Sequence, residues 1–473
     1  MTIYQLPDEV LLEIFSFYIC LSGGKDAWHT LVQVCQRWRC VVFGSPRRLD
    51  LRILCRDLNG TLTRTKLLDT WPKFPIAIHV YYGNACQPPS VADVISVLKR
   101  NDRVCKISIH NAPSSFLKEF AAISEPFPAL VELLLSSPPS AADTPILPDS
   151  FLGGSVPCLQ SLNLWGIPFP AIGKLLSSTR DLVTIYLGSI PPSGYISPEE
   201  MVNILSGLTK LKELHLTFFE IPRLLTHGAS QRPSVLTRVI LPALTTFSFL
   251  GNNNYLEEIV SRIDAPLDYI AVSLFDQPVI DIPLLRDFIG RTKIFNTSNR
   301  ADISVSNDNT RISLFRRKGD IDFKMLNLRI LYLRHIFNLS SLLWVCSSFL
   351  HPIPDLEHLG IYDFPSGRWR EVENTHWMEL LRPFTTVKHL VLDESTVFSV
   401  ASVLQELVED QVAEILPVLQ NIFLEGCESG PVPEGIVRFI GARELSGSPV
   451  AVHYRGTKRV IIYSSPSPSP SIV

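Results

Sequence analysis

The sequence lacks the cysteine pattern of a disulfide-linked secreted protein and of a zinc site. Its nine cysteines are an odd number, spread from Cys20 to Cys427, and no two of them form a Cys-x-x-Cys pair. Cysteines used in this way are typical of reduced thiols. We therefore expect no structural metal, and we expect the protein in the cytoplasm, the nucleus or both.

Long apolar runs are also missing. The first ten residues include Asp8 and Glu9, whereas a secretory signal begins with basic residues and ends at a small-residue cleavage site. No segment approaches the roughly 18 uninterrupted apolar residues that a membrane helix needs. Even the run from Ser340 to Leu350 stops at His351 and Pro352. We expect no membrane partner.

Positive charge is not in excess. The chain has 43 Lys and Arg against 46 Asp and Glu, a formal net charge of −3, and the only basic run that stands out contains Arg37, Arg39, Arg47 and Arg48. Proteins that bind nucleic acids usually carry a clustered basic excess to neutralise phosphates. Nucleic acid is therefore not an expected partner.

Catalytic motifs are absent as well. The sequence contains no Gly-rich phosphate loop, His-Glu-x-x-His pair, Gly-x-Ser-x-Gly elbow or kinase signature, and Gly290-Arg-Thr-Lys lacks the rest of a P-loop. The eleven histidines are scattered. We expect a protein without enzymatic activity and without a cofactor.

What the chain has is apolar residues in regular patterns. Of its 473 residues 46% are hydrophobic and 19% are charged, which is enough to bury a large core. The length exceeds that of one ordinary core, so it indicates either several domains or one array of repeats.

The N-terminal residues predict three short helices. The first starts at Pro7, whose missing N–H is tolerated at a helix start, and Asp8 and Glu9 favour the positive helix end. One broad apolar face is predicted for this helix, and the break from Ser22 to Asp26 ends it. The apolar residues that define the three helices are Val10, Leu11, Ile14 and Phe15, then Leu31 and Val34, then Trp38, Val41 and Val42.

This segment resembles an F-box. The resemblance rests on Leu6 to Phe15 and on Leu31 to Arg39, with a gap between them, and covers about residues 4 to 45. It implies docking onto a Skp-type adaptor that bridges to a cullin scaffold. By resemblance, interface or interface-supporting roles fall to Leu6, Pro7, Val10, Leu11, Ile14, Val34 and Trp38.

Two features depart from the F-box pattern. Gly23, Gly24 and Lys25 lie in the first inter-helix loop, and Cys35 stands where many F-boxes have a capping serine. Because cysteine is a poor cap, we expect the third helix to begin one residue later or to rely on another group.

The longer part of the chain repeats the pattern Leu-x-x-Leu-x-Leu, with other apolar residues allowed. Successive instances lie 23 to 33 residues apart, except for a step of 61 residues from Leu267 to Leu328, where we expect a degenerate turn. Within this step, the alternating pattern of residues 301 to 315 predicts two strands joined by an Asn-Asp-Asn turn. The instances start at Leu130, Leu159, Leu182, Leu211, Leu244, Leu267, Leu328, Leu356, Val387 and Leu419, with a weaker one at Val104.

Prolines and helix caps punctuate these repeats. A proline stands two residues before the first apolar position in five of them, where we expect it to end the preceding helix; these are Pro128, Pro157, Pro242, Pro354 and Pro417. Ser197 and Glu200 have capping-box spacing around Pro198. Similar helical patterns cover Tyr255 to Ile263, Ser340 to Leu350 and Val400 to Val408.

The alternation of strand and helix predicts an α/β fold: a right-handed solenoid with parallel strands on its concave face and helices on its convex face. It resembles leucine-rich-repeat proteins, and F-box proteins of fungal type often carry such irregular arrays. Short strands at Leu49 to Ile53, Ile76 to Val80 and Pro449 to Tyr454 are expected to close the ends. The predicted domains are an F-box at 1–46, a connecting cap at 47–100, the solenoid at 101–455 and a Ser/Pro-rich disordered tail at 456–473.

Side chains between the buried leucines point out from the strands, so they are candidates for contact with a target protein. Aromatic residues and arginine dominate this set, as they do at interfaces. Its members include Trp165, Tyr186, His215, Tyr332, Arg334, Tyr362 and Phe423. Asp393, Glu394 and Glu425 follow the last strands, where they are either a surface for basic partners or a solvated rim.

These patterns favour a substrate adaptor of a Skp-cullin-F-box ubiquitin ligase, with an unknown target protein. Two alternatives stay open: a repeat-based scaffold whose N-terminal helices only cap the array, and an F-box protein that acts outside ubiquitylation.

Overall fold

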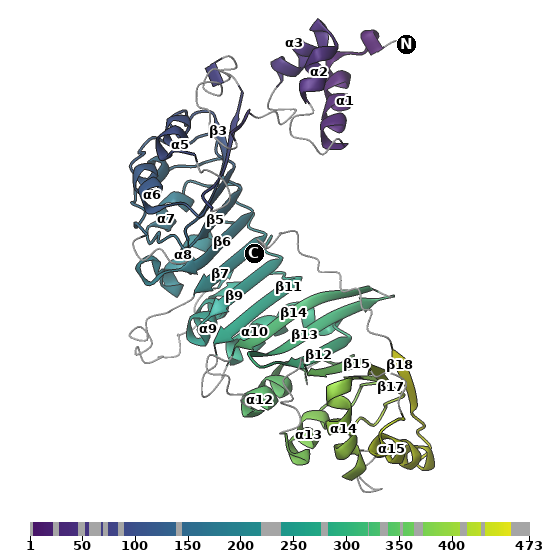
Figure 1. The fold of residues 1–473 in the computed structure, drawn as a ribbon. Helices are drawn as coiled ribbons and strands as arrows, with labels where there is room; N and C mark the ends of the chain where they lie inside the picture. The colour runs from purple at the N-terminus through teal and green to yellow at the C-terminus, as the bar shows by residue number, and fades with distance from the viewer. Residues whose placement is uncertain are drawn as a thin grey trace. The chain divides into compact units, whose positions relative to one another are not determined.

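The computed structural model is mixed α/β (Figure 1). It divides into two compact units, Met1–Leu211 and Lys212–Val473. The residues that it describes are 3–21, 28–45, 53–55, 68–69, 74–83, 89–138, 144–218, 238–275, 282–319, 321–331, 339–350, 353–363, 372–406, 414–426 and 431–455. The expected tail at 456–473 lies outside these residues.

The first unit opens with the three predicted helices. A 3₁₀ turn, η1 (Ile3–Gln5), precedes α1 (Asp8–Leu21), α2 (Trp28–Val34) and α3 (Gln36–Gly44). Contacts join α1 to both α2 and α3. The first helix begins at Asp8, one residue after the predicted start at Pro7.

Six strands of the first unit form a parallel sheet in chain order. The second apolar positions of neighbouring repeats lie opposite one another, with Ile107 paired to Leu133, Leu133 to Leu162 and Leu162 to Ile185. The second apolar positions identified in the sequence therefore align across these parallel strands. The strands are β1 (Ile53–Cys55), β2 (Ile76–Tyr81), β3 (Val104–His110), β4 (Glu132–Ser136), β5 (Ser161–Trp165) and β6 (Thr184–Ile190).

Short helices connect these strands and lie along one face of them (Figure 1). The predicted cap at Ser197 is confirmed, because Ser197 precedes the first residue of α8 and its hydroxyl accepts the Glu200 N–H at 3.2 Å. The connecting elements are α5 (Val91–Leu98), α6 (Ser114–Ala121), η2 (Phe151–Gly154), α7 (Ile172–Leu176), η3 (Pro192–Gly194) and α8 (Pro198–Ser206).

The recurring prolines have a different role from the one expected. Pro128 lies in a turn that the Leu130 N–H closes onto the Phe127 carbonyl (3.2 Å), whereas α6 ends earlier, at Ala121. The same bond closes the turns around Pro157, Pro242 and Pro417. Proline fits the second position of such a turn because its φ is already set. Each of these turns lies before a strand, which begins four residues after the proline.

The second unit also has a mostly parallel sheet. Leu214 pairs with Phe247 and Phe247 with Ile270, and further along Leu359 pairs with Leu390 and Leu390 with Ile422. Its parallel strands are β7 (Glu213–Phe218), β9 (Thr246–Gly251), β11 (Tyr269–Phe275), β15 (His358–Asp363), β16 (His389–Asp393), β17 (Asn421–Glu425) and β18 (Ala451–Arg455). A separate parallel pair is formed by β8 (Val239–Ile240) and β10 (Ile263–Asp264).

An antiparallel meander interrupts this order. It consists of β12 (Arg300–Val305), β13 (Asn309–Lys318) and β14 (Ile321–Leu331). The spatial order is β11-β14-β13-β12-β15, so the chain passes from β11 to the far side of the meander and returns. The hairpin predicted for 301–315 is confirmed.

The repeat instance starting at Leu328 is wrong in register. It would place Leu331 opposite Ile270, but Leu326 occupies that position. The 61-residue step therefore contains two added strands rather than a degenerate turn. Because apolar residues alternate regularly in β14, the sequence is compatible with several alignments of this strand against β11. The observed pairing with β11 selects one of them.

Seven helices are described in the second unit: α9 (Asn253–Arg262), α10 (Pro283–Gly290), α11 (Ile294–Thr297), α12 (Leu339–Phe349), α13 (Asn374–Leu381), α14 (Glu394–Glu406) and α15 (Glu434–Leu445). The start of α14 precedes the predicted one because the Asp393 carboxylate accepts the Thr396 N–H at 2.9 Å. Within the described residues, no helix is long and apolar enough to cross a membrane.

Candidate functional site

Helix α1 has two apolar faces where the sequence suggested one. Leu11, Leu12 and Phe15 are buried against α2 and α3. Val10, Ile14 and Phe17 lie one helical turn apart on another side and are 41%, 41% and 72% exposed, with Tyr18 beside them. A helix that is apolar on a second, solvent-facing side is suited to binding a partner.

An arginine ties the third helix to the start of the first. Arg37 Nη2 donates to the Leu6 carbonyl at 2.5 Å and to Asp8 Oδ1 at 2.7 Å, and its Nε donates to the same Asp8 oxygen at 3.2 Å. The pair is partly exposed, so its contribution to stability is modest. Its effect is to fix where α1 begins, next to Leu6 and Pro7.

The third helix begins at Gln36, directly after the cysteine that replaces the usual capping residue. Cys35 has an extended backbone, and its Sγ accepts the Trp38 N–H at 3.4 Å. The expectation that the helix starts later or relies on another group is therefore wrong. Sulfur accepts hydrogen bonds weakly, so the cap is present but poor.

The predicted adaptor-binding residues fall into two groups. Pro7, Val10, Ile14 and Val34 are exposed, whereas Leu11 is fully buried. Leu6 and Trp38 are half-buried, and the Trp38 ring packs on Phe15 with ring centres 4.7 Å apart. Leu11 and Trp38 thus support the surface from within.

Sequence reasoning missed Phe17 and Tyr18. The signal was present, because Val10, Ile14 and Phe17 continue one stripe at helical spacing. It was obscured by Leu11 and Phe15, which merge with this stripe when only the sequence is considered.

Comparison with known protein families agrees with this arrangement. Residues 3–52 match the F-box-like family. They form an F-box-like domain. The match covers the three helices and both ends of the exposed stripe. A comparison with curated proteins finds no match to the chain.

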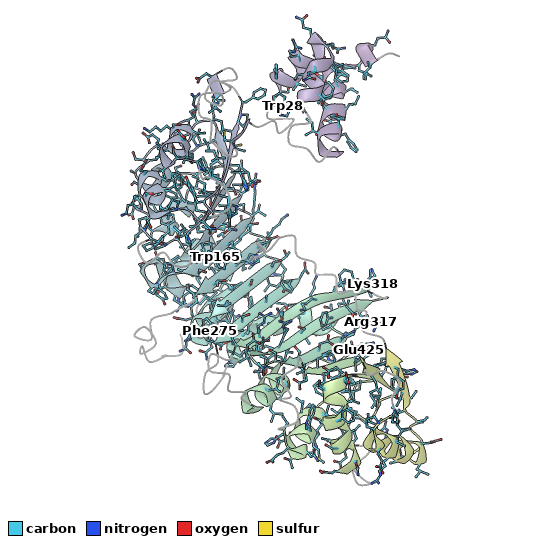
Figure 2. The ribbon with its side chains drawn as sticks, in the orientation of Figure 1. Trp28, Trp165, Phe275, Arg317, Lys318 and Glu425 are labelled. Atoms are coloured by element: carbon cyan, nitrogen blue, oxygen red, sulfur yellow. The ribbon has the colours of Figure 1, made fainter. Side chains whose placement is uncertain are left out.

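An aromatic cluster joins the F-box-like domain to the residues before β2. The Trp28 ring lies 5.6 Å from that of Phe74 and 6.2 Å from that of Phe43, with Phe43 and Phe74 5.5 Å apart. Trp28 and Phe74 are both buried. Figure 2 labels Trp28 within the helices. The cluster gives the domain an apolar contact beyond its own three helices.

The predicted target-binding residues of the first unit form one aromatic pair. Trp165 and Tyr186 stack across β5 and β6 with ring centres 5.8 Å apart, and both are half-buried. Gly188 leaves the space for this, because a Cβ there would overlap the Trp165 ring. Burial raises the pKa of Tyr186, so its hydroxyl stays protonated. The pair is a flat platform on the strands.

In the second unit, the predicted residues are distributed over several strands. His215 on β7 is half-buried, and burial lowers its pKa, so the ring is neutral at pH 7 and its 3.9 Å approach to Glu213 is not an ion pair. The Tyr362 hydroxyl lies 3.3 Å from Arg300. Phe423 stacks on His453 at 5.1 Å. Tyr332 and Arg334 lie outside the described residues.

A ladder of rings runs across β15 to β18. His358 stacks on His389 at 4.4 Å, and Asn421 bridges His389 and His453 with contacts of 3.1 and 2.9 Å. Burial is the main reason that the pKa of His358 is lowered to about 4, and the neighbouring His389 lowers it further. Among the acidic residues considered at this end, Asp393 has a structural role. Its carboxylate accepts the Thr396 N–H at the start of α14 and the Asp363 N–H at the end of β15, the latter at 2.7 Å.

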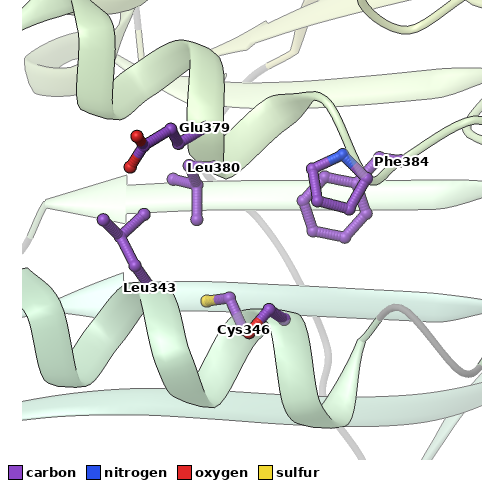
Figure 3. A pocket seen from close by; sticks show the side chains of 7 residues that line it. Leu343, Cys346, Glu379, Leu380 and Phe384 are labelled. Carbon is purple, nitrogen blue, oxygen red and sulfur yellow. The ribbon is translucent and has the colours of Figure 1, made fainter.

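A pocket of about 260 Å³ lies between α12 and α13 (Figure 3). Leu343 and Cys346 line it from α12, and Glu379 and Leu380 from α13. Complete burial raises the pKa of the Cys346 thiol, so this thiol is not a nucleophile. Only Glu379 brings a charge, so the pocket has no converging set of polar groups.

Proposed function

We propose that this protein is a substrate adaptor of a Skp-cullin-F-box ubiquitin ligase. F-box domains in general bind Skp-type adaptors, and residues 3–52 are an F-box-like domain. The observation that carries the proposal is the exposed apolar stripe of Val10, Ile14 and Phe17 on α1. Six of the sixteen exposed large apolar side chains in the described part of the chain lie between Ile3 and Val34. Such a concentration is typical of an interface.

In this proposal the strands select the target. Half-buried aromatic rings such as Trp165, Tyr186 and Phe423 lie on the strand face opposite the leucines and can anchor a partner. Parallel strands with leucines in register support a leucine-rich-repeat-like array, in which the β12–β14 meander is an irregular member. The chain itself has no catalytic role; it holds the target near enzymes recruited by a cullin, in the cytoplasm or nucleus.

The test is a pair of charge-bearing variants. Ile14→Asp with Phe17→Asp places two carboxylates in the apolar stripe, where adaptor contact would bury them. Affinity for a purified Skp-type adaptor should fall at least about 100-fold, measured by biolayer interferometry. The control, Ser16→Asp with Thr30→Asp, adds the same charge at exposed polar positions and should bind like wild type.

Equal affinity of the two variants would rule out docking through α1. Co-purification of a cullin with wild type, but not with Ile14→Asp/Phe17→Asp, separates a ubiquitin-ligase role from an adaptor role of another kind.

The buried Trp28–Phe74 contact favours one second function, a scaffold that the helices merely cap. Deletion of residues 1–45 would then expose Phe74 and unfold the strands of the first unit. In the leading proposal, the truncated chain keeps its circular dichroism in the strand region and loses only the adaptor.

A further inference from the structure

The antiparallel meander is the basic part of the second unit. Residues 300 to 331 contain seven Lys or Arg and four Asp, a net charge of +3, in a chain whose formal net charge is −3. Sequence reasoning missed this region because its cations are spread over 32 residues. Strand pairing brings them together.

The register aligns two arginines across neighbouring strands. Ile312, Leu314, Leu326 and Leu328 are buried, so alternation places Arg311 and Arg329 on the other strand face. Arg311 lies directly opposite Arg329. Like charges in such a pair repel each other.

Hydroxyl groups extend this arginine row on both sides. Ser304 of β12 lies opposite Arg311, and Ser273 of β11 lies opposite Arg329. Two residues further along the same strands, Asn327 lies opposite Ser313, which is buried. The row Ser304–Arg311–Arg329–Ser273 therefore offers guanidinium and hydroxyl donors along one line.

Most acids of the meander are already engaged elsewhere. Arg300, nearly buried, lies 3.0 Å from both Asp302 and Asp322. Asp308 accepts from the Ser306 hydroxyl, and this bond, followed by smaller effects that include Arg329, lowers the pKa of its carboxyl. Within the described residues, Arg311 has no ion pair, and its buried Nε has no hydrogen-bond partner. The local positive charge is therefore only partly balanced.

A buried lysine responds to this charge. Lys324 is 6% exposed, and its ammonium lies 5.5 Å from the Phe315 ring centre. Burial, and after it Arg311, lowers the pKa of Lys324 to about 8; Arg329 acts in the same direction. The positive charges of Arg311 and Arg329 therefore both disfavour the charged form of Lys324.

We propose that the row Ser304–Arg311–Arg329–Ser273 binds the phosphate of a phosphorylated serine or threonine in the target protein. The inference rests on the proposed function, because it names the chemistry by which the adaptor selects its target. A phosphate monoester carries about two negative charges and three acceptor oxygens at pH 7, which match two guanidinium forks and flanking hydroxyls. A single carboxylate matches only one of the two arginines.

The test uses the purified full chain and immobilised peptide libraries. Three libraries share random flanks and differ in one fixed residue: phosphoserine, serine or glutamate. Wild type should retain the phosphoserine library at least about tenfold better than the other two, and Arg311→Gln with Arg329→Gln should remove this preference. The control, Arg316→Gln with Lys318→Gln, removes two exposed cations of the same strand and should keep it.

A conservative pair guards against misfolding. Arg311→Lys with Arg329→Lys keeps the charge and loses the planar fork, so retention of the phosphoserine library should fall about three- to tenfold while the melting temperature is kept. The proposal is overturned by equal retention of the serine or glutamate library, by retention of single-stranded RNA as strong as that of the phosphoserine library, or by equal losses in the glutamine and control variants.

Adaptor docking and phosphate recognition can be tested independently of each other. Arg311→Gln/Arg329→Gln should bind the Skp-type adaptor like wild type, and Ile14→Asp/Phe17→Asp should retain the phosphoserine library like wild type. Loss of adaptor binding in the arginine variant would contradict the separation of docking from target recognition.

Discussion

The F-box-like domain and the strands of the two units use apolar residues in opposite ways. Each strand buries one row of leucines, and the other row consists of polar, charged or aromatic residues, as in Ser161, Asn163 and Trp165 of β5. Helix α1 buries one apolar face and exposes a second. The strands thus complete their core within the chain, whereas the helices have apolar surface left over for another molecule.

The strongest test of this comparison removes one phenylalanine from each region. Phe247→Ala on β9 leaves a cavity in the core, because this ring is fully buried and lies 6.3 Å from that of Phe288. It should cost about 3–5 kcal/mol of stability. Phe17→Ala, at a 72% exposed position, should change stability by less than about 0.5 kcal/mol and instead weaken adaptor binding. Thermal denaturation and adaptor titration measure both; similar melting temperatures for the two variants would contradict the comparison.

A smaller effect separates buried charge from buried apolar surface. The pKa of Lys324 is about 8 in the folded protein and about 10.5 in the unfolded chain, so the unfolded state binds more protons between these values. Stability therefore increases as pH rises from about 8 to about 10.5. Lys324→Met should raise stability at pH 7 by about 1–2 kcal/mol, after allowance for solvent screening, and by progressively less up to pH 10.5. Melting curves at pH 7, 9 and 10.5 measure this, and a difference that is independent of pH would contradict it.

The smallest effect concerns the cap of α3. Cys35→Ser replaces a weak sulfur acceptor by a hydroxyl, which should accept the Trp38 N–H more strongly and stabilise the F-box-like domain by about 0.5 kcal/mol. Cys35→Ala should destabilise it by a similar amount. Chemical denaturation followed by Trp fluorescence gives the free energy of unfolding of the three proteins, which should be highest for Cys35→Ser and lowest for Cys35→Ala. A serine variant less stable than wild type would show that the sulfur has a packing role instead.

Local patterns predict much of the fold. Residue spacing predicts that helices begin next to Pro7 and Ser197, and it predicts the alignment of apolar residues from Ile107 to Ile185, because each depends on neighbours in the chain or on a regular repeat. The frame of β14 could not be predicted, since it depends on which strand becomes its neighbour.

The candidate sites show the same limit. Val10 and Ile14 are identified by spacing, but their separation from Leu11 and Phe15 depends on how α2 and α3 pack against α1. The Arg311–Arg329 pair is eighteen residues apart in sequence and is created entirely by strand register. Burial of Leu11, likewise, is a property of the packed domain.

The meander also determines when β11 can pair with its neighbour during synthesis. In a simple array each new strand can pair with the one before it as the chain emerges from the ribosome. Here β12 and β13 emerge before β14, yet β14 is the partner of β11. The edge of β11 therefore waits for Leu331 to be synthesised, which at about 5–20 residues per second takes several seconds. During that interval β11 presents an open strand edge, so this point of the chain is where a chaperone that covers strand edges has most to protect.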